Sequence, residues 1–372
     1  MAIEHQLAPN TLLAVSYSGA HGVHLYDLAN LNGVGSAQAY AGQSLVTTLA
    51  SDTTVQQCPF PIPAEPGVNG CFTRLNPQYS NINVRGSNGV STYNGLNVKL
   101  QTTDFRHTGL TLVANYTYSH ALDDLSDTFS GSTIQASLGY TNPLHPQLDY
   151  GNSDFDVRHR LVLSPIWQTP WFKNGRGFLA QALGGWELSG IYTARTGTPF
   201  SIYDFNDVLI GYTVPRLTPA SPITQYHTGT PVQATTMNAA GMTVPVANQY
   251  TALTFPASGV TGPLNPALGI SDFGPFPANM TARNAFRGPG AWNLDTAAQK
   301  NFKLTERFGL QFRAEGFDVL NHHNFYVLAS GNYLQFSPYG SVTLEKGGLG
   351  TAATGGNNDE RRFMQFSLRL TF

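Results

Sequence analysis

Apolar and polar residues alternate along residues 361–372, at the end of the chain. The apolar residues occupy even positions, from Met364 and Phe366 to Phe372, and the odd positions include Gln365 and Arg369. Successive side chains of an extended strand point to opposite faces, so this pattern predicts a β-strand with one apolar and one polar face. The chain stops on the apolar face, at the aromatic ring of Phe372.

A strand of this kind that ends flush at a terminal Phe is typical of the last strand of bacterial outer-membrane barrels. In such a barrel the apolar face contacts lipid and the polar face contacts the lumen. A strand of a soluble β-sandwich can show the same alternation, so the rest of the chain has to decide between the two.

The same period of two predicts about eight strands along the chain. They cover Thr11–Tyr17 with a continuation past a glycine-containing kink to Tyr26, Tyr93–Thr103, Gly109–Ser119, Val157–Trp167, Gly185–Tyr203, Trp292–Leu304, Phe308–Val319 and 361–372. Pro165 indicates an irregular or edge position within its strand. The short segments 104–108 and 305–307 predict two hairpin turns.

The connections between these strands alternate in length. Connections 104–108, 168–184 and 304–307 are short or moderate, whereas 28–90, 120–156, 204–290 and 320–360 are long and rich in Gly, Pro, Asn, Ser and Thr. Compact soluble domains rarely carry four such long loops. Short periplasmic turns opposite long extracellular loops are typical of outer-membrane barrels. The fold prediction is therefore an all-β, antiparallel transmembrane barrel portion of about 8–12 strands that covers 1–372.

Aromatic residues then fall near both predicted membrane boundaries, where such barrels carry aromatic girdles. The periplasmic group is Trp167, Trp171, Phe172, Trp186, Phe302 and Phe372, and the extracellular group is Tyr116, Tyr118 and Trp292. His159 and Lys300 conflict with the pattern, because they share parity with apolar neighbours. A basic residue costs ~2–4 kcal/mol at the lipid midplane and ~0–1 kcal/mol at the interface. Since both lie near strand ends, we expect them to snorkel.

The composition supports a membrane environment. Only 11% of residues are charged, against about 25% in ordinary soluble domains. The net charge of −2 provides no electrostatic footprint for nucleic acid. No apolar run approaches the ~20 residues that a membrane helix needs. The first residues lack the basic and apolar regions of an export signal, so we expect the chain to be the C-terminal part of a longer protein or a mature form.

Several segments together resemble a known family, the TonB-dependent outer-membrane receptors, and more narrowly their Oar-like type, which is abundant in acidobacteria. The resemblance covers nearly the whole chain. It is carried by segments 91–96, 115–121, 154–160, 184–190, 283–290 and 312–322 and by the final strand, in that order. Each segment alone is weakly specific, and the ordered set is fairly specific.

The resemblance implies a nominally 22-stranded barrel in the bacterial outer membrane, of which this chain supplies roughly the last third. It also implies an N-terminal plug and a segment that contacts TonB, and this sequence contains neither. The partners implied are outer-membrane lipid, the plug, TonB, an unknown nutrient and, through the C-terminal strand, the barrel-assembly machinery. Arg313, Glu315, Gln311, Lys99 and Arg369 are then candidates for lumen-facing, plug-contacting residues.

Catalytic and metal-binding arrangements are poorly supported, so we expect neither an enzyme nor a cofactor. His21, His24 and the pair His322 and His323 have no carboxylate or Cys cluster at ligand spacing. The segment 154–160 contains Asp, Arg and His residues that suit an acid/base or calcium site, although an ion-pair network at the start of a strand is the simpler interpretation.

Cys58 and Cys71 flank a Pro-rich stretch of the first long connection. In an exported protein this arrangement predicts a disulfide, worth ~3 kcal/mol for a loop of ~15 residues in the chain-entropy model. Free thiols are the alternative.

Three functional hypotheses remain open at this point. The first is a barrel fragment of a receptor that imports a nutrient with inner-membrane energy. The second is a small self-contained barrel that acts as a passive pore or adhesin, since eight strands can close a barrel, although an open sheet with exposed edges is an equally physical outcome. The third is a secreted carbohydrate-binding β-sandwich. The sequence does not identify the transported substrate.

Overall fold

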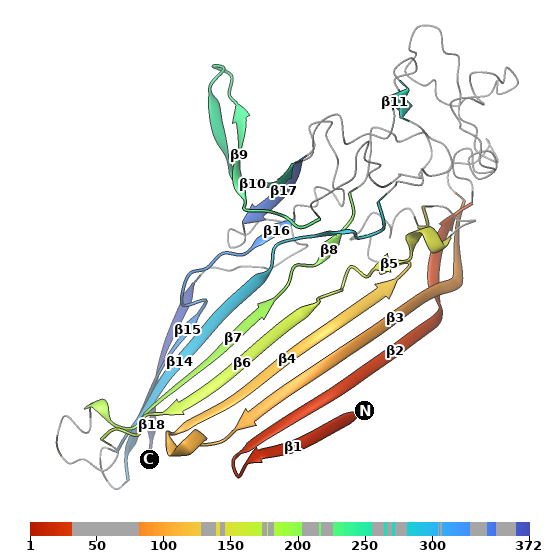
Figure 1. The fold of residues 1–372 in the computed structure, drawn as a ribbon. Coiled ribbons are helices and arrows are strands. Elements are labelled where there is room, and N and C mark those ends of the chain that lie inside the picture. The colour runs from red at the N-terminus through yellow and green to blue at the C-terminus, as the bar shows by residue number, and fades with distance from the viewer. Residues whose placement is uncertain are drawn as a thin grey trace, which may run out of the picture.

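The computed structural model is dominated by one large antiparallel sheet (Figure 1). The structure describes residues 1–31, 82–127, 139–141, 146–172, 177, 182–202, 216, 226–254, 264–265, 270–271, 281–303, 305, 307–327, 341–346 and 362–372. No helix among these residues is long and apolar enough to cross a membrane.

The large sheet contains ten strands, nine of which form a continuous path in the order β1-β2-β3-β4-β6-β7-β14-β15-β18. The strands of this path are β1 (Ala2–Ala8), β2 (Thr11–Asn30), β3 (Asn83–Thr102), β4 (Leu110–Asp123), β6 (His159–Gln168), β7 (Trp186–Arg195), β14 (Ala291–Lys303), β15 (Gly309–Phe317) and β18 (Phe363–Thr371). The tenth strand, β5 (Gly151–Asn152), pairs with β4. Sequence neighbours are therefore spatial neighbours, as in an up-and-down barrel wall.

Three smaller sheets lie at the end where the long connections are (Figure 1). The first pairs β16 (Phe325–Val327), β17 (Ser341–Lys346), β10 (Thr243–Thr254) and β9 (Val232–Met237), the second pairs β11 (Leu264–Asn265) with β12 (Ile270–Ser271), and the third pairs β8 (Pro199–Phe200) with β13 (Phe286–Arg287). Two 3-10 helices, η1 (Phe105–His107) and η2 (Pro146–Asp149), complete the described elements.

The alternation of apolar and polar residues stays in phase from strand to strand across the sheet. The apolar residue Leu370 lies opposite Leu310, which lies opposite Phe302, whereas the polar residue Arg369 lies opposite Gln311. Because the side-chain period of a strand is two, register alone keeps apolar residues on one face and polar residues on the other. The predicted alternation is thus realised as two chemically distinct faces of a single sheet.

The apolar face of β18 has no protein layer over it among the described residues. Phe366 is 65% exposed and Leu368 is 69% exposed. A contiguous apolar surface of this kind marks a contact with lipid or with another protein. The buried side chains, such as Phe286, Ile202 and Arg283, lie instead at the end where the long connections meet.

The two basic residues that conflicted with the pattern are accommodated at the strand ends. The Lys300 ammonium group donates to the carbonyl oxygen of Gly184 and lies 5.5 Å from the ring centroid of Trp186. The His159 Nδ1 atom lies 2.8 Å from the Tyr116 hydroxyl oxygen. Both residues stay on the apolar face, where neighbouring aromatic rings and a backbone carbonyl satisfy them.

The strand predictions are confirmed in outline, but several details are wrong. Strand β3 begins at Asn83, ten residues before its predicted start at Tyr93, and strands such as β10 and β17 within the long connections were not predicted. Strand β2 continues to Asn30, past register shifts after Gly22, as the predicted kink required. Strand β1 was not predicted, because polar residues such as His5 interrupt its pattern. The prediction of one strand over Gly185–Tyr203 is too long, and that over Val157–Trp167 begins two residues early.

A close backbone approach explains why β7 ends at Arg195. A Cβ atom on Gly197 would lie 1.9 Å from the carbonyl oxygen of Gly288. The chain therefore leaves the large sheet there, and its next residues, Pro199 and Phe200, pair with β13. Glycine is required because no other residue lets the two backbones approach this closely.

The two faces of β18 should respond differently to a new charge at the same depth. We expect Phe366→Arg to lower the unfolding free energy of the full protein in lipid vesicles by about 2–4 kcal/mol, because the charge would face lipid. The neighbouring Gln365→Arg should have almost no effect, since Gln365 lies opposite Glu315 on the polar face. Urea titration measures both, and equal losses would contradict the assigned faces.

Candidate functional site

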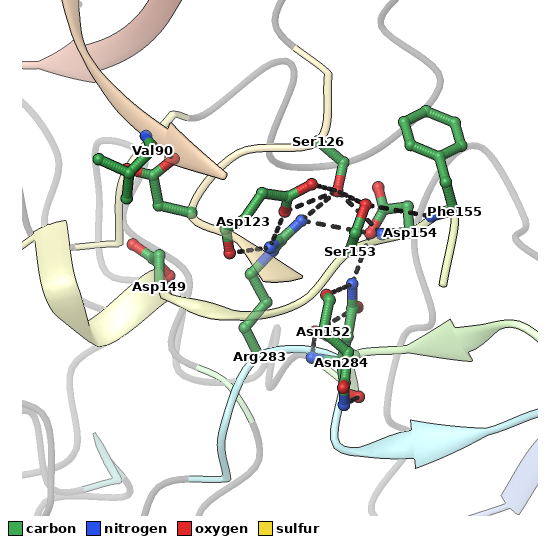
Figure 2. A network of polar contacts seen from close by, with 12 residues as sticks. Val90, Asp123, Ser126, Asp149, Asn152, Ser153, Asp154, Phe155, Arg283 and Asn284 are labelled. Carbon is green, nitrogen blue, oxygen red and sulfur yellow. Dashed lines mark hydrogen bonds and ion pairs between the residues drawn. The ribbon is translucent and has the colours of Figure 1, made fainter. Parts of the chain in front are cut away.

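Charged residues converge where β4, β5 and the segment before β13 meet. We call Asp123, Ser126, Asn152, Ser153, Asp154, Arg283 and Asn284 the rim cluster (Figure 2). Asp123 is the last residue of β4, and Asn152 ends β5. Arg283 lies near the end of the longest connection, 204–290, so the cluster joins segments that are far apart in sequence.

Arg283 lies at the centre of the rim cluster, with its guanidinium group between two carboxylates (Figure 2). It pairs with the Asp123 carboxylate, donates to the Asp123 carbonyl oxygen at 2.8 Å and to Ser126 Oγ at 2.6 Å, and lies 3.4 Å from Asp154. Its side chain is 0% exposed. A buried guanidinium is tolerated only with such partners.

Asn284 and Asn152 join the segment before β13 to β5 by reciprocal hydrogen bonds. Asn284 Nδ2 donates to the Asn152 carbonyl oxygen at 2.7 Å, and Asn152 Nδ2 donates to the Asn284 carbonyl oxygen at 2.9 Å. Asn284 has a left-handed backbone with φ of 52°, a conformation that Asn tolerates better than most residues. Gly151, which precedes Asn152, lets the two backbones approach closely, since a Cβ atom on it would lie 2.6 Å from the Arg283 carbonyl oxygen.

Asp156 forms ion pairs with two arginines beside the rim cluster. It accepts hydrogen bonds from the Ala121 N–H at 2.8 Å and from Arg158 Nε at 2.8 Å, and it pairs with Arg287. The Asp156 side chain is 0% exposed. These contacts confirm the predicted ion-pair network at the start of the β6 strand and supply a partner, Arg287, that the sequence did not indicate.

A third buried pair joins Arg216 to Asp149. The Arg216 side chain is 1% exposed and that of Asp149 is 0% exposed. Asp149 also accepts hydrogen bonds from the Thr141 backbone N–H and hydroxyl group, both at 2.7 Å. This pair fixes a residue of the long connection after β7 to the connection after β4.

Burial and hydrogen bonding set the ionisation of these carboxyls in opposite directions. Burial raises the pKa of Asp154 and of Asp124, and hydrogen bonds to Asp124 from the Val90 N–H and the Tyr140 hydroxyl only partly offset this. Burial also acts to raise the pKa of Asp156, but hydrogen bonds from Ala121, Arg287 and Arg158 outweigh it and hold that pKa below its ordinary value.

A pocket of about 720 Å³ opens on the polar face of the sheet next to this network. We call it the polar-face pocket. Its lining consists of Tyr93, Asn97, Thr117, Ser119, Phe155, Val157, Arg160, Thr193, Ala194, Arg195, Ala291, Trp292, Asn293, Asn324 and Tyr326. Aromatic rings, amides and two arginines therefore surround it, and no Asp or Glu contributes to its described lining.

One row of cross-strand neighbours forms the pocket floor. Asn97 lies opposite Thr117, Thr117 opposite Arg160, Arg160 opposite Arg195, and Arg195 opposite Ala291. Above this row the Tyr93 side chain lies over Gly95, where a Cβ atom would be 2.6 Å from the tyrosine hydroxyl oxygen. The glycine thereby lets the ring lie flat along the wall.

Another pocket, of about 790 Å³, involves the apolar face and is lined by Tyr116, His159, Arg158 and Arg287 among others. Of its three arginines, Arg158 and Arg287 both bind Asp156, so their charges are largely compensated, and the third, Arg195, also lines the polar-face pocket. The polar-face pocket is the better candidate for ligand binding because its charged groups are not engaged in this way.

The family model described as an outer membrane beta barrel domain matches residues 1–365. The chain belongs to this family. It is thus an all-β barrel portion of the bacterial outer membrane, with its apolar face toward lipid and its polar face toward the lumen.

Among solved structures, the chain is similar to the outer membrane transporter YddB from Escherichia coli. The sequence identity is 7% and the TM-score is 0.41, and the match covers 100% of this chain and 31% of that chain. The chain therefore spans about a third of the length of that transporter. No curated protein matches the chain.

The residues proposed to contact a plug share the polar face of the sheet. Arg313 pairs with Glu315, which accepts a hydrogen bond from Gln365 at 3.3 Å. Gln311 lies opposite Arg369, and Lys99 lies opposite Asn115. Their contact with a plug stays a prediction.

The tryptophans and phenylalanines of the predicted girdles lie at or just beyond strand ends, whereas Tyr116 and Tyr118 lie within β4. Trp167 and Trp186 lie at the end of β6 and the beginning of β7, and Trp167 makes an edge contact with Trp171 at 5.1 Å between ring centroids. Trp292 lies at the opposite end of the wall, stacked on His322. Phe302 is near the end of β14, and Phe372 follows β18.

The histidines that were considered as metal ligands, and the two cysteines, are the remaining candidates from the sequence. No group of three or more His, Cys, Asp or Glu side chains in the described ranges is arranged to hold a metal ion. His21 and His24 instead lie near Thr92 and the Ser87 carbonyl oxygen. The predicted disulfide between Cys58 and Cys71 lies outside the described residues.

Removing the central guanidinium of the rim cluster should be costly. We expect Arg283→Met to lower the unfolding free energy of the full protein by about 3–5 kcal/mol, because buried carboxylates lose their partner. Arg307→Met, in an exposed turn at the opposite end, should change it by less than about 0.5 kcal/mol. Urea titration in lipid vesicles measures the unfolding free energy of both variants. If Arg283→Met lowers it as little as Arg307→Met does, the rim cluster does not stabilise the protein.

The opposite pKa directions of Asp156 and Asp124 predict opposite pH dependences. Asp156 contributes stability that is present above its ordinary pKa of 3.8 and lost as the pH falls through its lowered value. Asp124 contributes stability below 3.8 that is lost as the pH rises through its raised value. Asp156→Asn should therefore reduce acid destabilisation of the full protein, and Asp124→Asn should increase it. Urea midpoints between about pH 3 and 7 measure both slopes, and slope changes of the same sign would disprove the assignment.

Proposed function

We propose that the chain is the C-terminal barrel portion of a TonB-dependent receptor that binds a nutrient from outside the cell and imports it across the outer membrane. The single observation that supports this most strongly is the polar-face pocket. It lies on the lumen face beside the rim cluster, at the end of the wall where the long connections are. A ligand entering from the extracellular side would meet this pocket before the rest of the lumen.

The length of two strands supports binding of a ligand outside the membrane. Strands β2 and β3 each span 20 residues, about twice the ~9–11 residues needed to cross the bilayer. Their excess length extends the wall beyond the membrane on the side of the long connections, where it can surround a ligand. Large barrels of this kind enclose a plugged lumen.

The proposal includes several partners beyond lipid. A plug domain would occupy the lumen against residues such as Arg313 and Glu315, TonB would supply energy from the inner membrane, and the barrel-assembly machinery would recognise β18. The ordered motifs of the Oar-like receptors in this sequence support these partners. We propose no enzymatic activity, because the site consists of structural ion pairs and a binding pocket.

Channel conductance tests the receptor against the alternatives. In planar bilayers the full protein should not conduct ions in its native state, because a plug would block the lumen, and it should conduct after mild urea has unfolded the plug. Immediate conductance would instead indicate a passive pore. Absence of conductance both before and after urea would indicate an adhesin.

Energy dependence provides the second measurement. Cells that carry the full protein and grow on a limiting nutrient that requires it should lose growth when the tonB gene is deleted. Growth that requires the protein but persists without TonB would overturn the proposal, since a passive pore needs no energy from the inner membrane.

A further inference from the structure

Arg160 and Arg195 are placed side by side without a counter-charge. They are directly opposed cross-strand neighbours of β6 and β7 on the lumen face, and both side chains are exposed. Directly opposed residues of this kind have Cβ atoms about 5 Å apart, and like charges there repel each other. The wall would be more stable with one of them neutral, so a structural role does not explain the pair.

Five other described arginines, namely Arg158, Arg216, Arg283, Arg287 and Arg313, have carboxylate partners. Arg313 pairs with Glu315 on the same lumen face, and Arg283 and Arg287 pair with aspartates at the rim. By contrast, no ion pair or hydrogen bond from either the Arg160 or the Arg195 side chain is formed within the described part of the chain. Their row neighbours, Thr117 and Ala291, are small and uncharged.

The surroundings of the pair are suited to an organic ligand. The polar-face pocket adds the aromatic rings of Tyr93, Phe155 and Tyr326 to the two arginines. Phe155 is 71% exposed and projects away from the rim cluster (Figure 2). Exposed aromatic rings next to cationic groups provide a flat apolar surface for the body of a ligand and an electrostatic contact for its charged end.

We propose that Arg160 and Arg195 form the anion-binding subsite of the polar-face pocket. The ligand carries a carboxylate, phosphate or sulfate group that takes charge-assisted hydrogen bonds from both guanidinium groups, whose planar forks match such oxyanions. Its uncharged body packs on the three aromatic rings. This inference deepens the proposed import function by naming the substrate class, and it rests on that function for the route by which the ligand arrives.

Binding of matched probes to the full protein tests the subsite. The probes are trigalacturonate, glucose 6-phosphate and sulfated galactose, each beside its uncharged parent sugar, measured by equilibrium dialysis with outer-membrane vesicles. At least one acidic probe should bind more tightly than its parent, and the probe that does so distinguishes carboxylate from phosphate and sulfate. If no acidic probe binds more tightly than its parent, the proposal is wrong.

Glutamine variants locate the anion on the wall. Arg160→Gln and Arg195→Gln should each weaken binding of the acidic probe by about tenfold, as expected for loss of one charge-assisted hydrogen bond, without affecting the neutral parent. Lys99→Gln removes a charge from the lumen face outside the described pocket lining and is the matched control. An equal loss in the control would show that only the general field of the lumen is involved.

Two further readouts separate ligand binding from a structural role. The urea midpoint of the double variant should equal or exceed that of the parent protein, because repulsion is removed. The double variant should also remain non-conducting in planar bilayers. A lower urea midpoint or a conducting double variant would mean that the arginines stabilise the sheet or contact a plug. Either result would overturn the proposed subsite. If growth does not depend on TonB but the protein still binds an acidic probe more tightly than its parent sugar, the import proposal is wrong and the anion-binding subsite stands.

Discussion

The structure depends on one constraint, which is that every backbone N–H and C=O group within the hydrocarbon must find a partner in the sheet. Antiparallel pairing of sequential strands meets this constraint for the strands that lie between β1 and β18 in the sheet, and it also fixes the register between neighbours. Fixed register then carries a single side-chain parity from β1 to β18. The lipid surface, the lumen surface and the position of the polar-face pocket all follow from that parity. A slip of one residue in any pairing would exchange the two surfaces for the strands beyond it.

The few charges of the chain are concentrated where the wall leaves the membrane. Arg216, Arg283 and Arg287 come from segments far along the chain and form buried pairs with Asp149, Asp123 and Asp156. Isolated buried charges would be strongly destabilising, so these pairs form only when the connecting segments are correctly placed. They therefore act as specific links between long connections at the rim of the pocket. The lumen wall below them keeps arginines exposed, where an incoming ligand can reach them.

Parity made most strands of the large sheet predictable, because alternation along a half-buried strand is a local property of the sequence. Strand β1 was missed where His5 and Gln6 weaken that alternation, and its pairing with β2 is a tertiary effect. The end of β7 was missed because it depends on Gly197 meeting Gly288, which is a non-local contact. Of the rim network, the sequence indicated the aspartates and Arg158 within 154–160. Their partners Arg283 and Arg287 lie more than a hundred residues away. The family resemblance drew attention to segment 283–290, but nothing in the sequence paired that segment with 154–160.

The most direct measurement of the central claim is the environment of each residue along the final strand. Single-cysteine variants at positions 363 to 371, with Cys58 and Cys71 replaced by Ser, would carry a nitroxide label in the full protein in lipid vesicles. Collisions with oxygen report lipid, and collisions with a water-soluble nickel chelate report the aqueous phase. Oxygen accessibility should peak at the even positions and nickel accessibility should not. A profile without a period of two, or with its maxima at odd positions, would contradict the account.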